Sequence, residues 1–149
     1  MFKKELANQL KNKTEFKDIL EDNTKDYGGD FSEIVVHAPK IYGLLCRLLD
    51  SKNISTGDRN RISSVIAYFI LPKDIFPEEL FGTKGYLDDI YLCLHILREL
   101  EEKYEIEELI EYWDGDVRTL KKLLNDHYET LDKKFSYILK DMLSYIGLR

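Results

Sequence analysis

Two strongly apolar stretches separated by a proline constrain the fold of this chain more than any other feature. The first, Ile62 to Leu71, is apolar on nearly all sides when placed on a helix, which is typical of a central, buried helix. Pro72 ends it, because proline disfavours helical geometry at the preceding residue. A second apolar stretch, Leu87 to Leu100, follows two glycines that mark a tight return. The pair predicts a buried helical hairpin over residues 60–100.

The remaining segments also favour helices. The chain has only three prolines and eight glycines in 149 residues, too few turn residues for an all-β fold of many short strands. Apolar residues recur at helical spacing before and after the hairpin. We therefore predict an all-α fold, a single compact domain of six or seven helices over residues 1–149. The helices outside the hairpin are expected near residues 2–20, 31–36, 39–52, 104–113 and 117–145.

The residues between the two apolar stretches carry a specific motif. Ala67 to Glu78 reads A-Y-F-I-L-P-K-D-I-F-P-E, and Gly85 to Asp89 reads G-Y-L-D-D. This combination resembles the YkvA-like family, catalogued as DUF1232, although the linker Glu79 to Lys84 is more polar than in many members. The resemblance implies a helical hairpin fold but no particular activity, and the family's occurrence beside ring-finger ubiquitin ligase domains suggests an adaptor role. The motif residues are Pro72, Asp74, Pro77, Glu78, Gly85, Tyr86, Asp88 and Asp89.

The acidic residues of this motif have two interpretations. In the first, Asp74, Asp88 and Asp89 accept backbone N–H bonds at turns and helix starts, each stabilising the fold by ~1 kcal/mol, or pair with Arg59 or Arg61. In the second, Asp74, Glu78, Asp88 and Asp89 supply hard oxygen ligands to Mg²⁺, Mn²⁺ or Ca²⁺. Adjacent residues on a helix point about 100° apart, which works against Asp88 and Asp89 sharing one ion. We expect no cofactor and keep a divalent cation as the alternative.

Charge is distributed unevenly along the chain. The net charge is −6, yet Asp74 to Asp116 contains 14 acidic residues against three basic ones. This balance argues against a nucleic-acid-binding protein, which needs a basic stripe to displace counterions from phosphates. The glutamates after the hairpin form either a solvated helix face or a docking surface for a basic partner. We take Glu101, Glu105 and Glu108 to represent that surface.

The sequence shows no catalytic set. His37, His95 and His127 lack metal-ligand spacing, and a hydrogen-bonded core histidine is the expected role of His95. Cys46 and Cys93 lie in apolar, helix-like runs and are expected to be reduced thiols of a cytoplasmic protein.

Neither a secretory signal nor a transmembrane stretch is expected. The longest apolar run, Val65 to Leu71, is far shorter than the ~20 residues that span a bilayer. The basic first helix leaves peripheral membrane contact open.

These observations favour a non-enzymatic protein-interaction or adaptor module that binds a protein partner or forms a homodimer. Two alternatives remain open. One is a metal-dependent hydrolase or nucleotide-processing enzyme that uses the clustered carboxylates. The other is a peripheral membrane-associated protein.

Overall fold

The all-α prediction is confirmed. The computed structural model describes residues 13–25, 28, 31–70 and 86–148, and within these ranges the chain forms helices and no strand. The elements are α2 (Lys13–Thr24), α3 (Ser32–Val35), α4 (Ala38–Leu49), α5 (Thr56–Ile70), α7 (Tyr86–Tyr112), α8 (Val117–Lys122), the π-helix η1 (Leu123–His127) and α9 (Tyr128–Tyr145).

The predicted count of six or seven helices is slightly off. Within the described ranges, five helices have 12 residues or more, namely α2, α4, α5, α7 and α9. The difference arises because α7 joins two segments that the sequence pattern separates. They meet at a kink at Glu105, whose backbone is non-helical with φ 70° and ψ 157°. The helical run α8–η1–α9 likewise follows the C-terminal apolar stripe without interruption.

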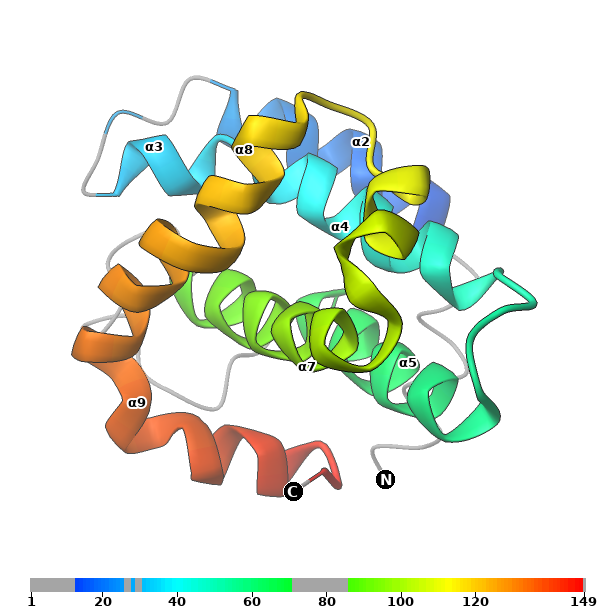
Figure 1. The fold of residues 1–149 in the computed structure, drawn as a ribbon. Helices are drawn as coiled ribbons and strands as arrows, with labels where there is room; N and C mark the ends of the chain where they lie inside the picture. Colours follow the sequence, from blue (N-terminus) through cyan, green and yellow to red (C-terminus); the bar gives the residue numbers. More distant parts are fainter. Residues whose placement is uncertain (1–12, 26–27, 29–30, 71–85, 149) are drawn as a thin grey trace.

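The two helices of the predicted hairpin lie at the centre of the molecule. Figure 1 shows α5 and the first part of α7 side by side, with α4 crossing them and α9 along one flank. The last six residues of α5, 65–70, are all buried, as are Ile90 to Leu94 on α7. Burial of apolar surface stabilises the fold by ~25 cal/mol per Å², so the contact of α5 with α7 contributes to the stability of the core. The segment that connects the helices, residues 71–85, lies outside the described residues.

Local signals in the sequence set several helix ends. Pro39 occupies the first turn of α4, where its missing N–H leaves no bond unmade. The Ser55 Oγ accepts a hydrogen bond from the Asp58 backbone N–H at the start of α5. After α9, Gly147 has φ 81°, and its N–H bonds to the Ser144 carbonyl while Leu148 N–H bonds to Leu143. This pair of bonds is a Schellman motif, which ends the helix at the glycine that follows the C-terminal apolar stripe.

None of the helices in the described ranges combines the length and the apolar character required to cross a membrane.

Candidate docking groove between α5 and α7

The motif residues fall into a described and an undescribed group. Pro72, Asp74, Pro77, Glu78 and Gly85 lie outside the described residues, so their predicted roles stay predictions. Tyr86 is the first residue of α7, and Asp88 and Asp89 lie in the first turn. Both aspartate side chains are buried, with exposed fractions of 0% and 4%.

The buried aspartates face the end of α5 and the core. The Tyr68 hydroxyl donates to Asp88 Oδ2 at 2.9 Å, which ties the last turn of α5 to the first turn of α7. Burial, followed by the nearby charge of Asp89, raises the pKa of the Cys93 thiol, so that thiol stays protonated. Neither this thiol nor that of Cys46 forms a disulfide bond among the described residues.

The expected ion pairs of the motif acids with Arg59 and Arg61 are not found among the described residues. Arg59 Nη2 instead donates to the Ser51 carbonyl at 2.6 Å, and Arg61 Nη2 donates to Glu99 Oε1 at 2.5 Å. Nor do the described residues contain a group of three or more His, Cys, Asp or Glu side chains that could hold a metal ion. Two of the four predicted ligands belong to the segment that the structure does not describe.

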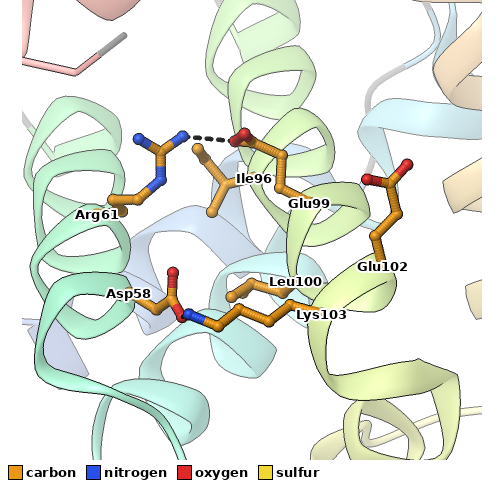
Figure 2. Close-up of a pocket in the computed structure, with 7 residues that line it drawn as sticks. All are labelled: Asp58, Arg61, Ile96, Glu99, Leu100, Glu102 and Lys103. Atoms are coloured by element: carbon orange, nitrogen blue, oxygen red, sulfur yellow. Dashed lines mark hydrogen bonds and ion pairs between the residues drawn. The ribbon is translucent and has the colours of Figure 1, made fainter.

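A groove runs between α5 and the middle of α7. Its volume is about 330 Å³, and Figure 2 shows Arg61 of α5 reaching across one end to Glu99 of α7. Lys103 crosses the other end, with its Nζ 2.7 Å from Asp58 Oδ2. Two buried apolar side chains line the groove between these bridges. The lining residues are Asp58, Arg61, Ile96, Glu99, Leu100, Glu102 and Lys103.

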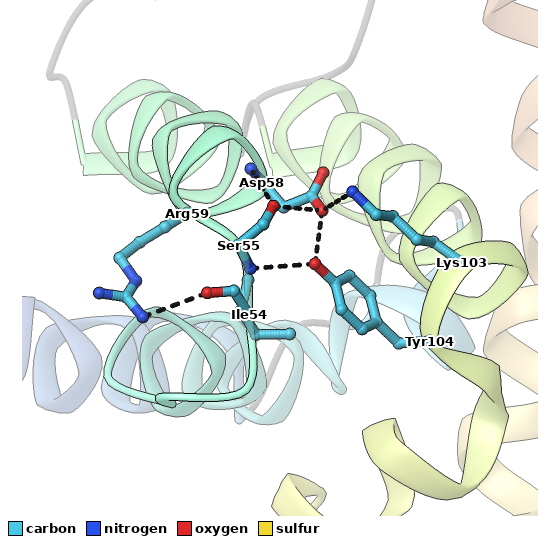
Figure 3. Close-up of polar contacts among 6 residues, drawn as sticks. All are labelled: Ile54, Ser55, Asp58, Arg59, Lys103 and Tyr104. Atoms are coloured by element: carbon cyan, nitrogen blue, oxygen red, sulfur yellow. Dashed lines mark hydrogen bonds and ion pairs between the residues drawn. The ribbon is translucent and has the colours of Figure 1, made fainter.

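Asp58 is held rigidly at the end of this groove. Its Oδ2 accepts hydrogen bonds from Ser55 Oγ at 2.9 Å, Lys103 Nζ at 2.7 Å and the Tyr104 hydroxyl at 2.6 Å (Figure 3). The Tyr104 hydroxyl also accepts a bond from the Ser55 backbone N–H. Burial acts to raise the pKa of Asp58, but the hydrogen bonds from Lys103, Tyr104 and Ser55 outweigh it and hold that pKa below its ordinary value. The carboxylate is therefore ionised at neutral pH.

The opposite end of the groove continues into a polar chain toward α9. Glu99 Oε1 also lies 3.6 Å from His95 Nε2, and His95 Nδ1 is 3.2 Å from the Tyr128 hydroxyl. Burial lowers the pKa of His95 despite the opposing charge of Glu99, so the ring is neutral at pH 7. The expectation of a hydrogen-bonded histidine at this position is thus confirmed, with Tyr128 as the partner.

The second half of α7 presents an acidic face beside the groove. Glu102, Glu105, Glu107 and Glu111 are exposed, whereas Glu101 and Glu108 are partly buried. We use "acidic face" for these six residues. The predicted docking residues Glu101, Glu105 and Glu108 all belong to it. Glu108 Oε1 accepts a bond from Asn53 Nδ2 at 3.1 Å, and within the described chain no lysine or arginine pairs with any of the six.

The stretch Ser55 to Asp58 offers capping side chains for a helix start, but nothing in the sequence identifies Asp58 as part of the groove. A local signal marks the cap, because Ser55 and Asp58 have the spacing of a capping box. The contacts of Asp58 with Lys103 and Tyr104 span 45 and 46 residues of sequence, so no local sequence pattern predicts them.

Comparison with known proteins shows to which family the chain belongs. The family described as "Protein of unknown function (DUF1232)" matches residues 61–94, which cover most of α5 and the first part of α7. A relative from Methanothermobacter thermautotrophicus, described as "Uncharacterized protein ORF9", is 31% identical over 130 residues, covering 87% of this chain and 88% of the relative. The chain belongs to the DUF1232 family. No solved structure matches this DUF1232 protein. The resemblance drawn from the motif is thereby confirmed. Of the residues that line the groove, Arg61 lies within the matched range, and the others lie before or beyond it.

Proposed function

We propose that this DUF1232 protein is a non-enzymatic interaction module that binds a basic segment of a partner protein through the acidic face of α7. The observation that carries the proposal is that, among the described residues, no lysine or arginine forms an ion pair with the glutamates of that face. Within the described residues, the ion pairs of this half of the helix involve Glu99 and Lys103, and neither belongs to the acidic face. Its charges therefore act outward, where they attract and orient a partner of opposite charge.

The shape of α7 supports the same proposal. The kink at Glu105 divides the acidic face and redirects the second segment of the helix. The Arg47 Nε donates to the Tyr112 carbonyl at 2.6 Å, and the Ser51 and Tyr112 hydroxyl oxygens lie 2.9 Å apart. These bonds fix the redirected segment against α4 and the loop after it. A fixed array of charges loses less conformational entropy on binding than a mobile one.

The test is the affinity of the protein for a lysine- and arginine-rich peptide, measured by fluorescence anisotropy at two salt concentrations. The variant Glu107→Lys/Glu111→Lys is expected to bind about tenfold more weakly, equivalent to ~1.4 kcal/mol. The matched control Asp18→Lys/Glu21→Lys makes the same charge change at exposed positions of α2 and is expected to retain most of the affinity. Equal loss in both variants would show that net charge alone governs binding, and the proposal would fail.

The proposal includes a cytoplasmic location. Support comes from the two free thiols, Cys46 and Cys93, which a reducing compartment preserves. Fractionation of cells that produce the tagged full chain tests this part of the proposal. Recovery in the membrane fraction would favour the peripheral membrane alternative instead.

A metal-dependent hydrolase or nucleotide-processing enzyme is the second candidate, favoured by the burial of two adjacent carboxylates, Asp88 and Asp89. The two candidates differ in the response of the melting temperature to Mn²⁺. An ion bound at these acids raises the melting temperature in the wild type and not in Asp88→Ala. A structural role of Asp88 instead gives a lower melting temperature in Asp88→Ala and no response to Mn²⁺ in either protein.

A further inference from the structure

The groove between α5 and α7 has the features of a receptor for one side chain. Its volume of about 330 Å³ lies at the small end of the range for ligand pockets, which suits a single long side chain better than a large metabolite. The side chains of Ile96 and Leu100 lie one helical turn apart along α7, between the two ion-pair bridges (Figure 2). Both side chains are almost completely buried, so they form the floor beneath the charged residues of the groove.

The Asp58 carboxylate at the end of the groove has one oxygen that accepts no hydrogen bond from the described residues. All three hydrogen bonds from side chains to the Asp58 carboxylate go to Oδ2, as Figure 3 shows, and among the described residues none reaches Oδ1. The three donors fix the orientation of the carboxylate, and Asp58 is only 15% exposed. A charge that is fixed, ionised and partly withdrawn from water binds a cation more strongly than a freely rotating surface carboxylate does.

We propose that the groove accepts a lysine side chain of the basic partner, with its ammonium group at Asp58 Oδ1. The ammonium group is a compact point charge that needs one acceptor, whereas a guanidinium group is matched best by two parallel carboxylate oxygens. Because Oδ2 is already occupied, the groove favours lysine over arginine. The lining carries three acidic and two basic side chains, so its balance is negative.

Lys103 already pairs with Asp58, so it competes with a partner's lysine for the same carboxylate. Lys103 pairs with Asp58 at 2.7 Å, yet its side chain is 57% exposed. Exposed ion pairs of this kind contribute little to stability, so Lys103 can turn away from a second ammonium group at Oδ1 at small cost, while Ser55 and Tyr104 still donate to Oδ2. Removal of the Lys103 charge makes the groove more negative and is expected to increase the affinity for a lysine side chain.

The inference rests on the proposed function, because the acidic face beside the groove supplies the attraction for the rest of the basic segment. It commits to a lysine within a protein segment rather than a free diamine. A free diamine contacts the groove alone and gains nothing from Glu105, Glu107 and Glu111, which lie farther along the helix.

Three peptides of the same length and spacing test the inference by fluorescence anisotropy with the full chain. Their basic positions hold lysine, arginine or acetyl-lysine. The wild type is expected to bind the lysine peptide at least about threefold more tightly than the arginine peptide and not to bind the acetyl-lysine peptide. Asp58→Asn is expected to remove the preference for lysine, whereas Lys103→Gln is expected to increase the affinity for the lysine peptide. Asp114→Asn, which removes one exposed acid beyond α7, is the control and retains the preference.

The outcomes separate this inference from the proposed function. If the lysine and arginine peptides bind equally well, and Asp58→Asn binds them as the wild type does, the lysine groove is wrong while the acidic face stands. If neither peptide binds, both proposals are wrong. If 1,5-diaminopentane competes as strongly as the lysine peptide, the protein-segment assignment is wrong. Melting curves identify a variant that fails to fold, and Lys103→Gln then supplies the decisive comparison, because weaker binding of the lysine peptide by that variant contradicts the proposal.

Discussion

The hydroxyl group of Tyr68 donates a hydrogen bond to Asp88 Oδ2 at 2.9 Å, and both side chains are almost completely buried. This bond joins the last turn of α5 to the first turn of α7. Removal of one partner of a buried hydrogen bond costs more than removal of one at the surface, because the group left behind has lost its contacts with water. The pair therefore helps to hold the two central helices in register.

Tyr68→Phe tests this role with the smallest possible change. Loss of one donor to a buried carboxylate is expected to lower the free energy of unfolding by about 1–3 kcal/mol, measured by urea denaturation. Tyr137→Phe is the matched control, because Tyr137 is 67% exposed on α9 and its substitution should change stability very little. Equal stability of the two variants would show that the Tyr68 bond does not hold the hairpin together.

A second prediction concerns the kink in α7. Glu105 has φ 70° and ψ 157°, a region that glycine adopts readily and that costs other residues about 1–3 kcal/mol. Glu105→Gly is expected to raise the free energy of unfolding by about 1 kcal/mol, against the usual loss for glycine within a helix. Glu105→Ala removes the same charge but keeps a Cβ, so it should not give this gain. If glycine destabilises the protein more than alanine does, the kink is not strained.

The turn after α7 gives a third prediction with a spectroscopic signal. A Cβ at Gly115 would lie 3.0 Å from Trp113 Nε1, which donates to the Asp116 carbonyl at 2.9 Å. Gly115→Ala is expected to displace the buried indole, shift its fluorescence to longer wavelength and lower stability by about 1–3 kcal/mol. Trp113 is the single tryptophan, so the signal reports this site alone.

Gly57→Ala is the control for that measurement. A Cβ at Gly57 meets nothing within 4 Å, and the residue lies in the first turn of α5. Alanine is expected to leave the fluorescence unchanged and to stabilise the protein slightly, by about 0.4–1 kcal/mol. An unchanged spectrum in Gly115→Ala as well would contradict the close contact with Trp113.

Much of the fold follows from local patterns in the sequence. The all-round apolar character of Ile62 to Ile70 predicted a buried helix, and the glycine after the C-terminal stripe predicted the end of α9. Both features depend on residues that are neighbours along the chain, so periodicity and capping rules detect them. The kink at Glu105 was not predicted, because no glycine or proline marks it. It is held instead by distant contacts such as that of Arg47 with Tyr112.

The candidate site was less accessible to sequence reasoning than the fold. The acidic character of α7 is visible in composition, and Glu101, Glu105 and Glu108 were identified from it. The groove was not, because it forms where Asp58 and Arg61 of α5 meet residues of α7 that are about 40 positions away. The packing of two helices determines such contacts, and a single sequence contains no local signal for their register.

The most direct test of the account is to map the binding surface by nuclear magnetic resonance, with backbone amide signals followed during titration of the lysine-rich peptide. The account predicts that the largest shifts belong to residues 99–111 and to Asp58, and that Glu107→Lys/Glu111→Lys weakens them at every peptide concentration. Shifts centred on α2 or α9, or spread evenly over the surface and unchanged in that variant, would contradict the claim that α7 of this DUF1232 protein carries the docking site.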